Sequence, residues 1–118
     1  AINAEVAATV KAKVICELAN GPTTPEGDEV LHKNGVHVIP DFLCNAGGVT
    51  VSYYEMVQNM YMHYWTADDV YAKLDAAMSA AYANVYAAAE KYNINMRQAA
   101  YVVAVERVVE GMKLRGWV

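Results

Sequence analysis

The first 40 residues alternate between short apolar runs and polar breaks. Residues 1–12 are rich in good helix formers and predict the end of a helix. Lys13–Leu18 reads K-V-I-C-E-L, a short run, β-branched at its start, that predicts a buried strand. After the loop N-G-P-T-T we expect a helix over Pro25–Lys33 and a second strand over Val36–Ile39. This order predicts two parallel strands joined by a crossover helix, the pattern of an open α/β sheet.

The rest of the chain has helical spacing of its apolar residues. A first helix is predicted from about Gly48 to Trp65, and it is apolar on most sides, so we expect it to be buried on more than one face. A long amphipathic helix should follow Thr66 and end near Asn93. A last helix is expected to end at about Leu114, with Gly116 as its stop.

Polar residues at the expected helix ends support these boundaries. Thr24 is a plausible N-cap for the first crossover helix, and Gly35 can take the left-handed conformation at its end. Thr66-x-x-Asp69 is close to a capping box, and the N-x-x-Q run that begins at Asn95 repeats this pattern before the last helix.

Composition limits the class of protein. The 118 residues are 56% hydrophobic and 19% charged, which excludes intrinsic disorder. No apolar run approaches the roughly 18 residues of a membrane span, and no leader peptide is recognisable. The net charge is −4, and the one small basic cluster, Lys11 and Lys13, is too small to bind a nucleic-acid backbone. We therefore expect neither a membrane nor a nucleic-acid partner. The chain begins at Ala1 rather than Met, so we expect it to be processed or a piece of something longer.

Cysteine and histidine residues do not suggest a metal site. Cys16 and Cys44 form no disulfide framework and no zinc motif, so reduced thiols in a cytoplasmic protein are expected. None of the histidines, His32, His37 and His63, has the i, i+4 partner of a helical metal motif.

The run Asn45-Ala46-Gly47-Gly48-Val49 is the strongest candidate for a binding site. It follows a strand and opens a helix, where free N–H groups and the helix dipole favour a carboxylate or a phosphate. The hydroxyl of Ser52, one turn further on, can join the same pocket. An ordinary tight turn before a packed helix explains the run equally well.

A second polar loop, Asn20–Thr24, also follows a strand. Ligands of open α/β sheets bind at the carboxyl ends of the strands, so two such loops should line one cleft for an anionic small molecule. Helix capping is the favoured role of Thr24 itself. Glu17 lies in a buried strand, where a structural hydrogen bond is its favoured role. Five aromatic residues lie further along the chain, and core packing is their expected role: Tyr53, Tyr54, Tyr61, Tyr64 and Trp65.

Several blocks of the chain resemble the C-terminal part of glutamate dehydrogenases of the hexameric microbial type. They are E-L-A-N-G-P-T-T-P-E-G-D-E-V-L, V-I-P-D-F-L-C-N-A-G-G-V-T-V-S-Y-Y-E-M-V-Q-N, Y-W-T, M-R-Q-A-A-Y-V-V-A-V-E-R-V and R-G-W, in the order and spacing of the family. The resemblance implies an α/β fold in which residues 1–47 form part of a Rossmann-type dinucleotide-binding domain. Residues 48–118 would be long C-terminal helices that return to the substrate domain.

The resemblance also implies an activity and site residues. The activity is NAD- or NADP-dependent oxidative deamination of L-glutamate to 2-oxoglutarate and ammonia, in a cytoplasmic homo-hexamer. Asn20 and Asn45 would lie beside the nicotinamide end of the cofactor, and Val49 and Ser52 would face the substrate. The catalytic lysine, the catalytic aspartate and the glycine-rich phosphate turn of the family would all lie upstream of Ala1, so no catalytic residue is expected in this chain.

Two interpretations of the chain stay open at this point. It is a segment of an active dehydrogenase, or it is an excised or engineered fragment with a structural or assembly role and no activity of its own. A related dehydrogenase acting on leucine, valine or phenylalanine is a weaker third interpretation, because an apolar substrate side chain needs no hydroxyl at Ser52.

Overall fold

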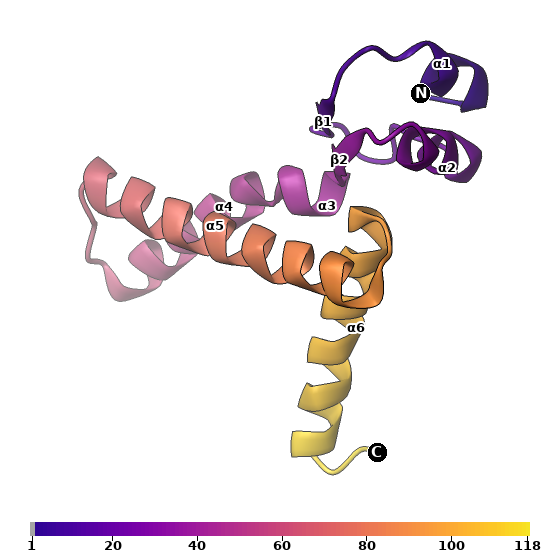
Figure 1. Cartoon of the computed structure of the whole chain (residues 1–118). Helices are drawn as coiled ribbons and strands as arrows, with labels where there is room; N and C mark the ends of the chain where they lie inside the picture. Colours follow the sequence, from indigo (N-terminus) through magenta and orange to yellow (C-terminus); the bar gives the residue numbers. More distant parts are fainter. Residues whose placement is uncertain (1) are drawn as a thin grey trace.

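The computed structural model describes residues 2–118, which form two strands and six helices (Figure 1). In chain order these elements are α1 (Ala4–Thr9), β1 (Val14–Cys16), α2 (Pro25–Lys33), β2 (His37–Ile39), α3 (Asp41–Cys44), α4 (Ala46–Tyr61), α5 (Ala67–Tyr92) and α6 (Met96–Leu114). The fold is mixed α/β, as the sequence predicted.

The two strands pair in parallel, with α2 as the crossover between them. Ile15 lies opposite Val38 in the centre of the pair. Helix α1 packs on α2, and a small core of Ala7, Leu31 and Val38 lies between these helices and the strands. The predicted parallel pair is therefore confirmed, although β1 is shorter than the run Lys13–Leu18 that suggested it. The expectation that this strand is buried is wrong, because Val14 and Cys16 are exposed and Ile15 is half-buried.

The expected caps are present at the helix ends. The Thr24 side chain accepts a hydrogen bond from the Gly27 N–H, and Asn95 accepts one from Gln98. Thr66 and Asp69 form a complete capping box at the start of α5. Because these side chains satisfy N–H groups that a helix leaves free, they fix where each helix begins. At the other end of α2, Gly35 takes the predicted left-handed conformation with φ of +72°.

The segment between β2 and α5 differs from the prediction. A short helix, α3, begins directly after Pro40, whose carbonyl oxygen accepts hydrogen bonds from the amides of Leu43 and Cys44. Helix α4 ends at Tyr61 rather than Trp65, because Met62 is left-handed, with φ of +51°.

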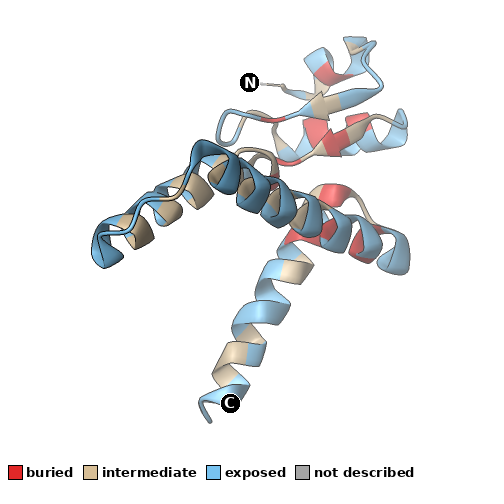
Figure 2. Cartoon of the chain, turned by 90° about the vertical axis from the view of Figure 1, so that its left-hand side faces the viewer, coloured by how far each residue is buried: buried red, intermediate tan, exposed pale blue. Residues whose placement is uncertain are grey.

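The expectation that α4 is buried on several faces is wrong for this chain. No residue of α4 is buried, and Figure 2 shows this helix and most of α5 in the exposed and half-buried colours. In the aromatic group of residues 53–65, only Tyr54 and Trp65 are half-buried; they pack edge to face, and the other members are exposed. The apolar surface of α4 is real, but among the described residues only the neighbouring elements α3 and α5 pack against it appreciably.

The main core lies where the end of α5 meets the start of α6 (Figure 2). It consists of Leu43, Val85, Ala88, Ala89, Met96, Ala99 and Ala100. Its many alanines allow the two helices to approach closely, and β2 and α3 close the core from the other side through Ile39 and Leu43. This packing holds the first turn of α6 against the sheet. No helix within residues 2–118 is both long enough and apolar enough to cross a membrane.

Candidate functional site

Two loops meet at the carboxyl ends of β1 and β2. The side-chain amide of Asn45 donates one hydrogen bond to Asn20 Oδ1 at 2.7 Å and another to the carbonyl oxygen of Leu18 at 3.1 Å. Asn20 follows β1, whereas Asn45 lies between α3 and α4, after β2. The two loops therefore converge, as the prediction of parallel strands implied. They do so through direct contact between two of the predicted site residues, Asn20 and Asn45.

The start of α4 lies directly beside this contact. Asn45 is the residue before the helix, but its side chain caps no N–H of α4. Its amide group is turned toward the other loop, to which it donates both hydrogens. Val49 and Ser52 are three residues apart on α4, so they share one face of the helix. Both are exposed, Val49 to 70%, and the Ser52 hydroxyl donates to the carbonyl oxygen of Gly48 at 3.1 Å.

The threonines of the first loop serve the fold. Thr24 caps α2, as expected, and Thr23 Oγ1 donates to Glu17 Oε1 at 2.6 Å. Glu17 itself is buried, with 3% of its surface exposed, and its other oxygen accepts from the Asp41 amide at 3.0 Å. The structural hydrogen bonds predicted for Glu17 are therefore present.

Arg97, in the first turn of α6, is at the centre of a cluster that the sequence did not indicate. One guanidinium nitrogen donates to Glu17 Oε1 at 2.7 Å and to Asp28 Oδ1 at 3.2 Å, and the other donates to Asp41 Oδ1 at 3.4 Å. The three carboxylates come from three separate segments, 56 to 80 residues before Arg97 in the chain. No local signal could have indicated these pairs. We call Arg97, Glu17, Asp28 and Asp41 the Arg97 cluster.

Charge and hydrogen bonding set the protonation of the cluster. Burial alone would lower the pKa of Arg97, but hydrogen bonds to Glu17 and Asp28 outweigh it, so the pKa of Arg97 lies above its ordinary value. The pKa of Asp41 is lowered, chiefly by the hydrogen bond that its carboxylate accepts from the Gly21 amide at 2.8 Å, and the charge of Arg97 adds to this effect. At neutral pH the cluster therefore holds a guanidinium against ionised Asp41.

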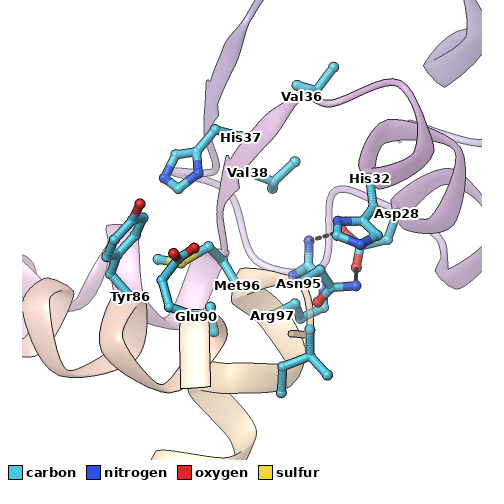
Figure 3. Close-up of a pocket in the computed structure, with 12 residues that line it drawn as sticks. Asp28, His32, Val36, His37, Val38, Tyr86, Glu90, Asn95, Met96 and Arg97 are labelled. Atoms are coloured by element: carbon cyan, nitrogen blue, oxygen red, sulfur yellow. Dashed lines mark hydrogen bonds and ion pairs between the residues drawn. The ribbon is translucent and has the colours of Figure 1, made fainter. Parts of the chain in front are cut away.

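A cavity of about 170 Å³ borders the cluster. Figure 3 shows Arg97, Asp28 and Asn95 at one side of this cavity, with His37 and Tyr86 at another.

Nowhere in residues 2–118 do three or more histidine, cysteine or acidic side chains come together as metal ligands would. Both cysteines are free, and burial raises the pKa of the Cys44 thiol, with the nearby Cys16 adding to the shift.

Residues 1–116 match the model of the Glutamate/Leucine/Phenylalanine/Valine dehydrogenase family, and the chain belongs to this family. Over 116 residues it is 53% identical to the NAD-specific glutamate dehydrogenase of Clostridioides difficile and 50% identical to the glutamate dehydrogenase of Thermotoga maritima. These matches cover 98% of this chain but only 28% of each relative. The chain thus corresponds to a C-terminal segment of a glutamate dehydrogenase.

Solved structures show the same fold. Glutamate dehydrogenase from Peptoniphilus asaccharolyticus superimposes with a TM-score of 0.93 at 51% identity, over 99% of this chain and 30% of that one. The hetero-hexameric glutamate dehydrogenase from Thermus thermophilus gives a TM-score of 0.89 at 31% identity, over 95% of this chain and 27% of that one.

Proposed function

We propose that this chain forms the cofactor- and substrate-facing edge of an NAD-dependent glutamate dehydrogenase. The reaction would be oxidative deamination of L-glutamate to 2-oxoglutarate and ammonia. The observation that carries the proposal is the contact between Asn20 and Asn45 beside the start of α4. It occurs in a chain 53% identical to an enzyme that is described as NAD-specific.

The free polar atoms of the two asparagines fit a nicotinamide group. Both hydrogens of the Asn45 amide are donated within the chain, which leaves Asn45 Oδ1 as an acceptor; Asn20 Nδ2 makes no hydrogen bond within residues 2–118 and is available as a donor. A carboxamide needs one acceptor and one donor, so this pair complements it. The bound cofactor would accept the hydride, while Asn20 and Asn45 bind and orient its carboxamide.

Val49 and Ser52 would contact the substrate. Because the Ser52 hydroxyl is exposed and rotatable, it can give up its bond to Gly48 and donate to the side-chain carboxylate of glutamate. A hydrogen bond to a charged group is worth about 1.5–3 kcal/mol. A hydroxyl at this position favours glutamate over the apolar substrates of the same family.

The remaining parts of the enzyme would come from outside these residues. We propose that the upstream part of the same subunit supplies the catalytic groups and the phosphate-binding turn, and that the subunits form a homo-hexamer. The hetero-hexameric assembly of the Thermus thermophilus relative supports a hexamer, although not its composition from identical subunits. Two free cysteines support the cytoplasm as the location.

Steady-state kinetics of a full-length subunit containing residues 1–118 would test the proposal. Ser52→Ala should raise KM for glutamate about 10- to 100-fold and leave KM for NAD within about twofold. Ser79→Ala, the same substitution on the exposed side of α5, is the control and should change neither. A correctly assembled enzyme that does not reduce NAD with glutamate would refute the function. An unchanged KM for glutamate in Ser52→Ala would remove Ser52 from the site.

A further inference from the structure

Helix stability does not explain the position of Arg97. It is the second residue of α6, in the turn where the helix dipole is positive and a cation is unfavourable. Its side chain is also mostly removed from water, with 19% exposed. Removing a guanidinium from water is costly unless carboxylates surround it, so the reason for this arginine lies in the three carboxylates that it contacts.

Two of these carboxylates are bonded directly to the loops that carry the asparagines. Asp41 accepts from the amide of Gly21, the residue after Asn20, and Gly21 is left-handed with φ of +58°. Glu17 accepts from Thr23 in the same loop and from the Asp41 amide at the start of α3. Arg97 bonds to both Glu17 and Asp41, so one side chain joins the loop after β1 to the segment after β2.

We propose that Arg97 is a positioning residue for the nicotinamide cofactor. It holds the Asn20 loop and the α3–α4 segment in the register at which Asn20 and Asn45 meet. This inference rests on the proposed function, because it assigns the cofactor to that asparagine pair. Without the guanidinium, the direct hydrogen bonds between the loops would remain, but the carboxylates would lose their shared counter-ion and the register of the two loops would loosen.

The cavity beside the cluster makes a conservative variant practical. Arg97 lies at the edge of this cavity (Figure 3), which is large enough for several water molecules. In Arg97→Lys the charge is kept and water can fill the space of the lost nitrogens. A lysine cannot reproduce the planar fork that reaches carboxylates in two directions, so it neutralises the cluster without fixing both loops.

The test is NAD binding to a full-length subunit that contains this chain. Arg97→Lys should raise the dissociation constant for NAD, measured by fluorescence titration, about tenfold, the equivalent of one weakened hydrogen bond. KM for glutamate should stay within about twofold. Arg107→Lys is the matched control, because Arg107 is exposed on the same helix and makes no ion pair within residues 2–118. The Arg107→Lys enzyme should bind NAD with unchanged affinity.

A double-mutant cycle separates positioning from general destabilisation. If Arg97 acts through Asn45, then Arg97→Lys should add little to the effect of Asn45→Ala on NAD binding. Additive effects would overturn the inference. If Arg97→Lys fails to assemble, Asp41→Asn replaces it, because an asparagine keeps the acceptor for Gly21 but loses the charge that Arg97 contacts; this variant should also weaken NAD binding.

The outcomes distinguish the two proposals. Weaker NAD binding in Asn45→Ala together with unchanged binding in Arg97→Lys would overturn the role of Arg97 and leave the cofactor site in place. Unchanged NAD binding in Asn45→Ala would overturn the asparagine site itself, and with it the role of Arg97.

Discussion

The isolated 118-residue polypeptide should not exist as a stable monomer. Its surface of 8185 Å² exceeds the roughly 6,300 Å² expected for a folded monomer of this mass by about 1,900 Å². Its radius of gyration is 17.0 Å, compared with about 13.5 Å for a compact chain of this length. The excess arises where α4, α5 and α6 extend away from the two cores (Figure 1).

The size of this excess decides the expected outcome. If slightly more than half of it is apolar, covering it would contribute roughly 25 kcal/mol at about 25 cal/mol per Å². That is more than the 5–15 kcal/mol by which a typical domain is stable. Exposed residues such as Met60, Tyr61 and Met62 should therefore be covered by a second copy, or the helices should lose their fixed packing.

Light scattering and hydrogen exchange on the purified chain would check this expectation. We expect a mass above 12.9 kDa that depends on concentration, or a monomer in which the amides of β1 and β2 exchange rapidly. A full-length subunit that contains the same residues is the control and should protect both strands. A concentration-independent monomer with slow exchange in Val14–Cys16 and His37–Ile39 would refute the reasoning.

Three further results are expected. The isolated chain should not reduce NAD or NADP with glutamate above a buffer blank, since a positioned acid or base alone is worth about 10²–10⁴-fold in rate; measurable turnover would contradict this. Gly27→Ala should destabilise the full-length enzyme by about 1–3 kcal/mol in denaturant unfolding, because the new Cβ would lie 2.6 Å from the carbonyl oxygen of Ile2; Gly111→Ala, with open space around it, should not. The lowered pKa of Asp41 means that its ionised form stabilises the fold above the ordinary value of 3.8 and that this contribution disappears as the pH falls through the lowered value. Asp41→Asn should therefore reduce Tm at pH 7 and reduce it less below about pH 4; an equal loss at both pH values would count against this role.

Features encoded by neighbouring residues were predictable from the sequence. The bounds of α2 and the end of α6 follow from caps and glycines that act within one helical turn, and the parallel strand pair follows from the order of the elements. The meeting of Asn20 and Asn45 was predictable for the same reason, because both follow strands that run in one direction. The roles of Asn20, Asn45, Val49 and Ser52 toward ligands stay predictions.

Features that depend on distant chain were not predictable. From the sequence, Arg97 is expected to be an ordinary surface residue of a helix. Its role depends on contacts with three carboxylates from earlier segments, which only the folded chain brings together. The apolar pattern of α4 correctly indicates a helix that needs neighbours, but a periodicity cannot tell whether those neighbours lie within the same 118 residues. The early end of α4 depends on a left-handed Met62, which no propensity favours.

The separation in sequence between Arg97 and its partners has a consequence for biosynthesis. The ribosome adds Glu17, Asp28 and Asp41 before Arg97. At about 5–20 residues per second, several seconds pass between the synthesis of these acidic residues and that of Arg97. Until Arg97 is made, Glu17 and Asp41, which follow the two strands, lack the guanidinium that they contact in the folded chain. A chain truncated before α6 would lack this guanidinium permanently. If Asn20 and Asn45 bind the dinucleotide, as proposed above, this edge should become competent for it only after the last helix has been made.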